Sequence, residues 1–122
     1  MNHLANWIEI PVIDLDRAKK FYAAILDAHF NDMEIGAMSY ALFSVDDKFN
    51  SGALVAADGR KPSQDGVTVY LNGGSDLAKV LGRVKKAGGR VLVEKTPISK
   101  DAGFFGFFTD TEGNKMGVHS MF

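Results

Sequence analysis

Glu9 and His119 are the two side chains whose chemical types favour acid–base chemistry in this sequence. An imidazole titrates near neutral pH, and a nearby carboxylate can orient it or exchange a proton with a substrate. Two other interpretations of the pair stay open: the groups can satisfy each other or the backbone in a polar patch, or they can contact a ligand without reacting. His3 and His29 are interpreted as surface residues, since they fall near the start of the chain and at the start of a polar strand.

The composition excludes several other kinds of site. The 122 residues include no cysteine, so thiol catalysis, disulfide bonds, iron–sulfur clusters and cysteine-bound zinc are excluded. Fourteen basic and fifteen acidic residues give a net charge of −1, which is not the basic field of a nucleic-acid-binding domain. No apolar run approaches the roughly 18 residues that span a bilayer, and the first residues do not resemble a secretory signal. We therefore expect a cytoplasmic protein that contacts neither nucleic acid nor membrane.

The elements that position Glu9 follow from hydrophobic periodicity in the first half of the chain. Residues 6–12 alternate between apolar and other side chains, which predicts a strand. Asp14 is predicted to cap a helix of about twelve residues, whose apolar side chains recur every three or four positions. Three further strands are predicted at residues 30–35, 37–45 and 52–57, followed by a polar loop at residues 58–66.

The second half repeats this order and ends on the strand that carries His119. Strands are predicted at residues 67–72, 90–94, 104–109 and 115–121, with a helix capped by Ser75 or Asp76 and ending near Ala87. The sequence therefore predicts an α+β fold, a single domain of residues 1–122 with two βαβββ modules at about 4–57 and 66–122. Because one module cannot bury both its helix and its sheet, the two are expected to form a curved mixed sheet around a cavity.

Strand alternation then predicts which side chains face that cavity. If Ile8, Ile10 and Val12 pack on the helices, then Trp7 and Glu9 face the cavity. By the same argument, Met116 and Val118 pack on the helix side while Gly117 and His119 face inward. Thr68, Tyr70 and Asn72 would face it as well. The predicted ligand-binding residues are Trp7, Tyr40, Thr68, Tyr70 and Asn72. A mostly apolar cavity with a few polar groups is typical of small-molecule binding.

Three segments give the chain a resemblance to a known family. They are residues 9–22 (EIPVIDLDRAKKFY), 86–91 (KAGGRV) and 107–114 (FFTDTEGN). In order and spacing, they resemble the vicinal-oxygen-chelate superfamily, which includes glyoxalase I, bleomycin-resistance proteins, extradiol dioxygenases and methylmalonyl-CoA epimerase. The resemblance covers nearly the whole chain. It implies paired βαβββ modules and a homodimer, whereas the activity is not implied, because the superfamily has varied chemistry.

The resemblance also implies where a metal ion would bind, and the residues at those positions depart from the family. The expected histidine of the first strand aligns with Trp7, that of the fifth strand with Thr68 or Val67, and the expected glutamate of the last strand with Gly117. The fourth strand, residues 52–57, has no carboxylate, imidazole or side-chain amide. We therefore predict no metal site and no cofactor.

Several functions remain open from the sequence. We favour a metal-free protein of the glyoxalase and bleomycin-resistance type that binds a small molecule in its cavity. The alternative is a lyase or isomerase of the same superfamily that uses Glu9 and His119 as base and acid, or a metal ion if the alignment is displaced. A purely structural or interaction role would predict a filled cavity.

Overall fold

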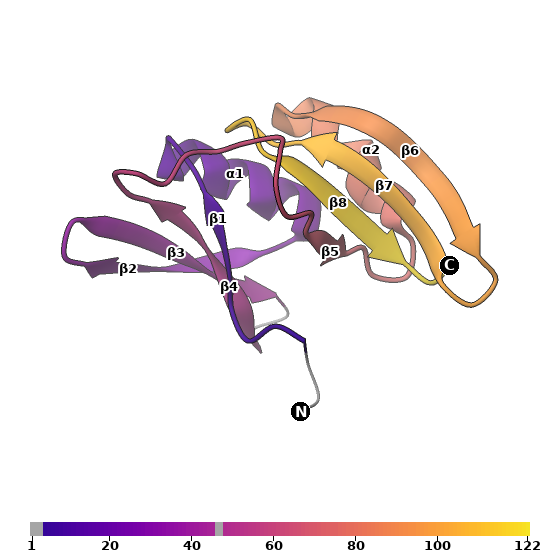
Figure 1. Ribbon diagram of the computed structural model, residues 1–122, viewed down its shortest axis with the longest axis horizontal. Helices are drawn as coiled ribbons and strands as arrows, with labels where there is room; N and C mark the ends of the chain where they lie inside the picture. Colours follow the sequence, from indigo (N-terminus) through magenta and orange to yellow (C-terminus); the bar gives the residue numbers. More distant parts are fainter. Residues whose placement is uncertain (1–3, 46–47) are drawn as a thin grey trace.

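The structure, a computed structural model, describes residues 4–45 and 48–122. The elements of the first half are β1 (Ile8–Pro11), α1 (Leu15–Leu26), β2 (His29–Ile35), β3 (Met38–Val45) and β4 (Lys48–Ala56). Those of the second half are β5 (Tyr70–Asn72), α2 (Leu77–Ala87), β6 (Arg90–Ser99), β7 (Gly103–Thr109) and β8 (Lys115–Ser120) (Figure 1). The predicted α+β class and the order of two βαβββ modules are confirmed.

Each module forms its own four-stranded sheet. The strand orders are β1-β4-β3-β2 and β5-β8-β7-β6, so the same connectivity occurs twice. In each sheet the first strand pairs in parallel with the last, and the other pairs are antiparallel. The single curved sheet expected from the sequence is thus two separate sheets placed next to each other.

Both helices begin and end where the sequence predicts. The side chains of Asp14 and Asp76 accept hydrogen bonds from backbone N–H groups in the first turns of α1 and α2, which makes them the N-caps. Gly88 ends α2 in the left-handed conformation with φ of 106°, which a glycine adopts without a steric penalty. Asp27 takes the corresponding position after α1, with φ of 53°. Among the described residues, no helix has both the length and the apolar character needed to cross a membrane.

The largest differences from the predicted strand boundaries are in β4, β5 and β6. β4 begins earlier than predicted, at Lys48, and β6 continues beyond its predicted end at Glu94 to Ser99. The pairing of β6 with β7 passes through several register shifts, so backbone pairing continues where side-chain alternation has broken down. β5 is shorter than predicted and covers only residues 70–72, since the Val67 side chain is 91% exposed and packs on no core.

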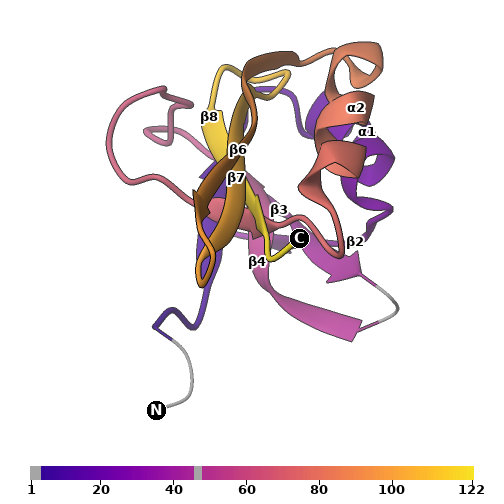
Figure 2. The ribbon, with the colours of Figure 1, turned by 90° about the vertical axis from the view of Figure 1, so that its right-hand side faces the viewer.

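The main hydrophobic core lies between the helices and the sheets. α1 packs on the first sheet and α2 on the second. The two helices lie on the same side of the molecule and contact each other (Figure 2). Ile10 and Val12 of the first module and Met116 and Val118 of the last strand are buried in this core, as alternation predicted. The opposite faces of the sheets carry the residues of the candidate site.

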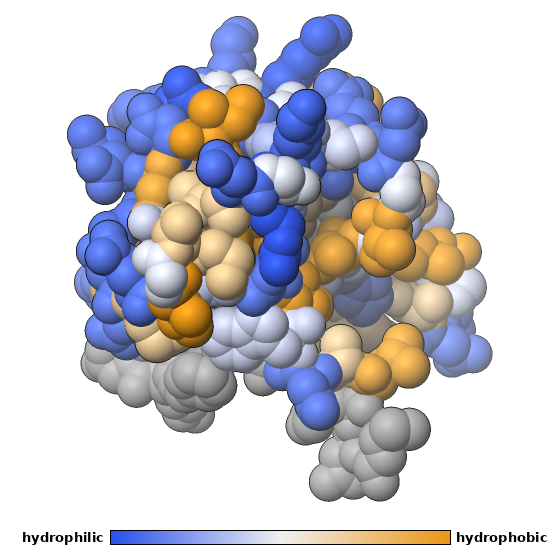
Figure 3. Space-filling model, turned by 60° about the vertical axis from the view of Figure 1, so that its left-hand side comes forward, coloured by the Kyte–Doolittle hydropathy of each residue, from blue (hydrophilic) through white to orange (hydrophobic). Residues whose placement is uncertain are grey.

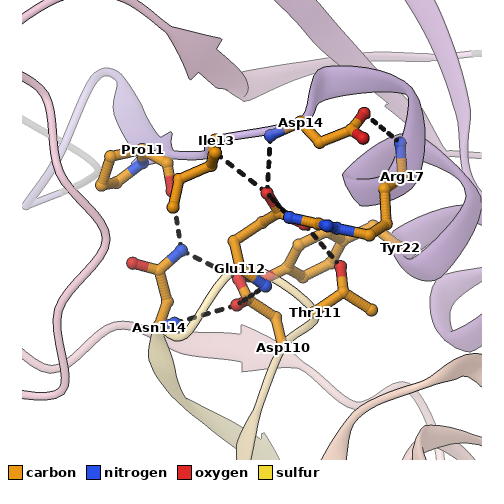
Figure 4. Close-up of polar contacts among 9 residues, drawn as sticks. All are labelled: Pro11, Ile13, Asp14, Arg17, Tyr22, Asp110, Thr111, Glu112 and Asn114. Carbon is orange, nitrogen blue, oxygen red and sulfur yellow. Dashed lines mark hydrogen bonds and ion pairs between the residues drawn. The ribbon is translucent and has the colours of Figure 1, made fainter.

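Glu112, in the turn between β7 and β8, joins the two modules. Its carboxylate accepts hydrogen bonds from the backbone N–H groups of Ile13 at 2.9 Å and Asp14 at 2.7 Å, and from the hydroxyl of Thr111 at 2.9 Å. Arg17 completes the cluster through its Nε at 2.7 Å and its Nη2 at 3.0 Å (Figure 4). Burial raises the pKa of Glu112, but these hydrogen bonds outweigh it and lower the pKa from 4.5 to about 2.

A second buried cluster in the same turn reinforces this junction. The hydroxyl of Tyr22 on α1 donates a 2.6 Å hydrogen bond to the buried carboxylate of Asp110. Asn114 donates from its side chain to Asp110 and to the carbonyl oxygen of Pro11, at 2.9 and 2.7 Å (Figure 4). Burial and the charge of Asp110 raise the pKa of Tyr22 well above its ordinary value. Contacts between residues about 90 positions apart thus fix the second module against the first.

Candidate functional site

His119 lies on β8 with its side chain on the face turned away from the helices. In the sheet it is paired with Asn72 on one side and with Phe105 on the other. Its Nε2 is 2.6 Å from the carbonyl oxygen of Ala102. Because a carbonyl oxygen only accepts hydrogen bonds, Nε2 must carry the hydrogen, and the neutral ring then keeps Nδ1 as an unprotonated acceptor. Within residues 4–45 and 48–122, the hydrogen bonds of the protein leave Nδ1 unused.

An aromatic platform extends from His119 along the same face. Tyr70 is paired with Gly117, and Gly117 is paired with Phe107, so all three share the face of His119. The rings of Tyr70 and Phe107 are 5.6 Å apart between centroids, and the ring of Phe105 follows at 5.4 Å from Phe107. The platform, defined as Tyr70, Phe105 and Phe107, ends in the half-exposed ring of Tyr70.

Gly117 makes this platform possible. A Cβ atom built at this position would lie 2.6 Å from Cδ1 of Tyr70, which is closer than two carbon atoms can approach. The tyrosine ring therefore occupies the space above the glycine that any larger residue would fill. Lys115 lies beside it with Nζ 4.6 Å from the centroid of Phe107, a cation–π contact that places a positive charge at the border of the platform.

A hollow of about 620 Å³ adjoins the platform and brings three predicted residues together. Tyr70, Asn72 and His119 line it, with Met121 and Phe122 at its border. The oxygen of the Asn72 side chain accepts a 2.8 Å hydrogen bond from the N–H of Gly74, which fixes the amide beside His119. The second module thus contributes an imidazole, an amide and an exposed ring to one surface.

Glu9 lies on the first module and has partners of its own. Its carboxylate accepts hydrogen bonds from Nε1 of Trp7 at 3.1 Å and from Nη1 of Arg60 at 2.5 Å. The hydrogen bond from Arg60 lowers the pKa of Glu9. This pairing makes Glu9 a weaker base than a free carboxylate, and none of the described hydrogen bonds joins it to His119.

The remaining predicted residues differ in accessibility. Tyr40 is buried in a small cluster with Ala53 and Val55 on the face of the first sheet opposite the main core, and its hydroxyl contacts the sulfur of Met38 at 3.6 Å. Trp7 directly precedes β1 and is 39% exposed. Thr68 is exposed and lies before β5, since that strand is shorter than predicted.

The segment between β4 and β5 passes over the side of the sheets away from the helices (Figure 2). It brings Arg60 to Glu9 and so adds a positive charge that strand alternation did not predict. Figure 3 shows a hollow bordered by hydrophobic residues, in the right half of the view, on this side of the molecule. The sequence predicts one cavity that holds Glu9 and His119 together, whereas the hollow beside His119 is lined by Tyr70 and Asn72 and not by Glu9.

The residues present do not fit the metal site that the fold family implies. Gly117 has no side chain, and the ring of Tyr70 occupies the space beside it. Among the described residues, no three histidine, aspartate or glutamate side chains are grouped as ligands for a metal ion. A protein metal site needs several such ligands in fixed geometry.

Comparison with known proteins decides the family. The family model of the Glyoxalase/Bleomycin resistance protein/Dioxygenase superfamily matches residues 2–118. The chain belongs to this superfamily. A glyoxylase-like domain-containing protein of Didymella fabae is 30% identical over 114 residues, which cover 91% of this chain and 88% of that protein. The chain spans only 44% of the length of two mycobacterial relatives, 28% identical, whose names include the word glyoxylase.

Solved structures of the superfamily share the fold. A glyoxylase/bleomycin resistance protein/dioxygenase domain from Frankia sp. EAN1pec superposes with a TM-score of 0.75 over 98% of both chains, at 17% identity. The fosfomycin resistance protein FosX of Listeria monocytogenes, as an E126Q mutant complexed with Mn(II), superposes with a TM-score of 0.65 at 16% identity; the match covers 98% of this chain and 91% of that one. The superfamily fold is thus present here with a different set of residues at the expected metal position.

Proposed function

We propose that this superfamily member binds a small planar molecule on the aromatic platform of its second module, without a metal ion. The observation that supports this most strongly is the half-exposed ring of Tyr70, held over Gly117 and against Phe107. A flat ring stacked on such a surface gains about 0.5–1.5 kcal/mol beyond the burial of its area. Trp7, Thr68 and Asn72 are proposed to contact the ligand as well, and the buried ring of Tyr40 to support the binding surface from below.

The polar groups at the border of the platform define the ligand further. Lys115 offers a positive charge, and the amide of Asn72 offers hydrogen-bond donors next to the free Nδ1 of His119. A planar molecule that carries a carbonyl or carboxylate group together with a hydrogen-bond donor matches this set.

The test is a thermal-shift and fluorescence screen of planar carbonyl and carboxylate metabolites, each with and without EDTA. We expect hits that EDTA does not alter. Tyr70→Ala should weaken them at least tenfold, because it removes the exposed ring. Val67→Ala is the matched control, since Val67 is exposed and lies just before the same strand. Hits that vanish with EDTA, or that Tyr70→Ala leaves unchanged, would refute the proposal.

A glyoxalase-type lyase or isomerase is the second candidate, and the tautomer of His119 favours it. The bond from Nε2 to the carbonyl of Ala102 leaves Nδ1 able to accept a proton from a substrate. In this candidate Glu9, paired with Arg60, orients groups on the first module rather than acting as the base. If activity is found, His119→Ala should abolish it and flatten its pH profile, whereas Glu9→Gln should raise KM with a smaller change in kcat. Activity that survives His119→Ala excludes this mechanism.

We further propose that the chain acts as a homodimer in the cytoplasm. Its surface has large exposed hydrophobic side chains on several elements, among them Ile35, Leu92, Ile98 and the terminal Phe122. Contact with a second chain would bury such side chains, and burial of apolar area favours association. Light scattering of the purified protein should give twice the mass of one 13.2 kDa chain, and the mass of a single chain would exclude the dimer.

A further inference from the structure

A hollow of about 550 Å³ opens between the two modules on the side of the sheets that carries the helices. Its walls come from β1, β5 and both helices, and they are mainly apolar: Ile8, Ile10, Ile25, Leu71 and Val80 contribute. The volume lies within the roughly 300–1,000 Å³ usual for small-molecule pockets. This hollow adjoins the one beside the platform, since Leu71, Asn72, Gly74 and Ser75 line both. Tyr70 and His119 line only the hollow beside the platform, whereas both helices line only this one.

The hollow lies at the end of the junction between the modules that is far from the Glu112 cluster. At the start of α1, the cluster around Glu112 holds the modules together through several hydrogen bonds. At the other end of α1, residues 25–27 face the segment 71–75 and the side of α2 across the hollow. An apolar space at this end therefore has room for a ligand.

Charged residues at the border of the hollow leave one unbalanced positive charge. Arg83 and Asp27 form an ion pair at 3.1 Å across it, so their charges cancel. Lys79, one turn before Arg83 on α2, also lines the hollow. Asp76 attracts Lys79, but this carboxylate is already hydrogen bonded to Nζ of Lys95 at 2.9 Å. The charge that remains at the border suits a monoanion.

We propose that this hollow binds an amphipathic monoanion, that is, a small carboxylic acid with an apolar chain or ring. The apolar part would occupy the space between β1, β5 and α2, where its removal from water favours binding. The carboxylate would stay at the border beside Lys79, where it remains partly hydrated and does not bear the full cost of burying a charge.

Octanoate is the probe that tests this proposal, with octan-1-ol and octylammonium as matched neutral and cationic probes. Amide chemical shifts in a ¹⁵N-labelled sample report the site. We expect octanoate to shift the amides of Ile25, Asp27 and Val80 in a saturable way, because these residues line this hollow and not the one beside the platform. Octan-1-ol should bind more weakly, and octylammonium should not bind, because the Lys79 charge repels it.

Two variants of border residues make the test specific. Lys79→Glu reverses an exposed charge and should weaken octanoate about tenfold. Asp27→Asn removes the carboxylate that neutralises Arg83 and should strengthen octanoate several-fold; asparagine suits the left-handed conformation of this position. Lys85→Glu is the control, because it makes the same charge change on α2 at a residue that does not line the hollow.

The outcomes separate this proposal from the one for the platform. Tyr70→Ala should leave octanoate binding unchanged, so each site can fail independently. Equal binding of octanoate and octan-1-ol, or octanoate binding unaffected by Lys79→Glu, would overturn the proposal. Attachment to anionic phospholipid vesicles without any shift by free octanoate would overturn it too, since it would indicate a membrane-surface contact instead of an acid-binding pocket.

Discussion

Glu112→Gln is the substitution that most directly tests how the modules are held together. Glu112 is buried, and every hydrogen bond that its carboxylate makes is accepted by one of two negatively charged oxygens. Glutamine replaces one of these oxygens with an NH₂ group. That group must then face a donor, either the Arg17 guanidinium or the backbone N–H groups at the start of α1. The change therefore removes a charge and leaves buried donors opposed to each other.

The pKa of Glu112 gives the magnitude. The folded protein holds it at about 2 against an ordinary value of 4.5. A difference of about 2.5 units at 1.36 kcal/mol per unit corresponds to about 3 kcal/mol in favour of the ionised folded state at pH 7. Since the folded pKa is the lower one, this stabilisation is complete above about pH 5 and is lost as the pH falls toward 2.

Urea unfolding of wild type and Glu112→Gln, followed by circular dichroism, measures the effect. We expect Glu112→Gln to lower the free energy of unfolding by about 3 kcal/mol at pH 7 and by only about 1 kcal/mol at pH 3. Glu94→Gln is the matched control on an exposed glutamate and should change stability by less than about 0.5 kcal/mol at either pH. A loss below 1 kcal/mol at pH 7, or an equal loss at both values of pH, would refute this reasoning.

Three further predictions concern Gly117, Tyr22 and Arg60. Gly117→Ala should displace the Tyr70 ring and cost about 1–3 kcal/mol of stability, measured by urea unfolding; an unchanged protein would show that the ring does not need the glycine. In a spectroscopic titration at 295 nm, Tyr22→Phe should remove only a step well above pH 10, because burial raises the pKa of Tyr22; loss of a step near pH 10 would contradict this. Arg60→Gln should raise the pKa of Glu9 toward its ordinary value in an NMR titration; no change would mean that the ion pair is absent in solution.

The fold was largely predictable because local signals and tertiary packing agree. The capping aspartates and Gly88 mark the helix ends, and the alternation of Ile8, Ile10 and Val12 correctly identifies the helix side of β1. Backbone pairing can extend a strand where the side-chain pattern gives no signal, so the ends of β4 and β6 were missed. The division into two sheets depends on contacts between modules, which strand periodicity does not describe.

The site was predictable where it depends on strand register. Tyr70, Asn72 and His119 lie together because β5 and β8 pair in parallel, and alternation then fixes their common face. Arg60 was missed because it lies in a loop, where no strand or helix periodicity indicates which residues a side chain will contact. The helix-side hollow was missed for a related reason. It lies between two packed modules, and a sequence pattern predicts which side chains are buried but not how two modules pack against each other.

A crystal structure of untagged protein, purified without a chelator and soaked with a planar carboxylate from the screen, tests the central claim most directly. It should place the ligand ring against Tyr70, with its polar groups near Lys115 and His119 and no metal ion within bonding distance. A metal ion coordinated beside Gly117 and His119, or a ligand that leaves the Tyr70 ring untouched, would contradict the claim.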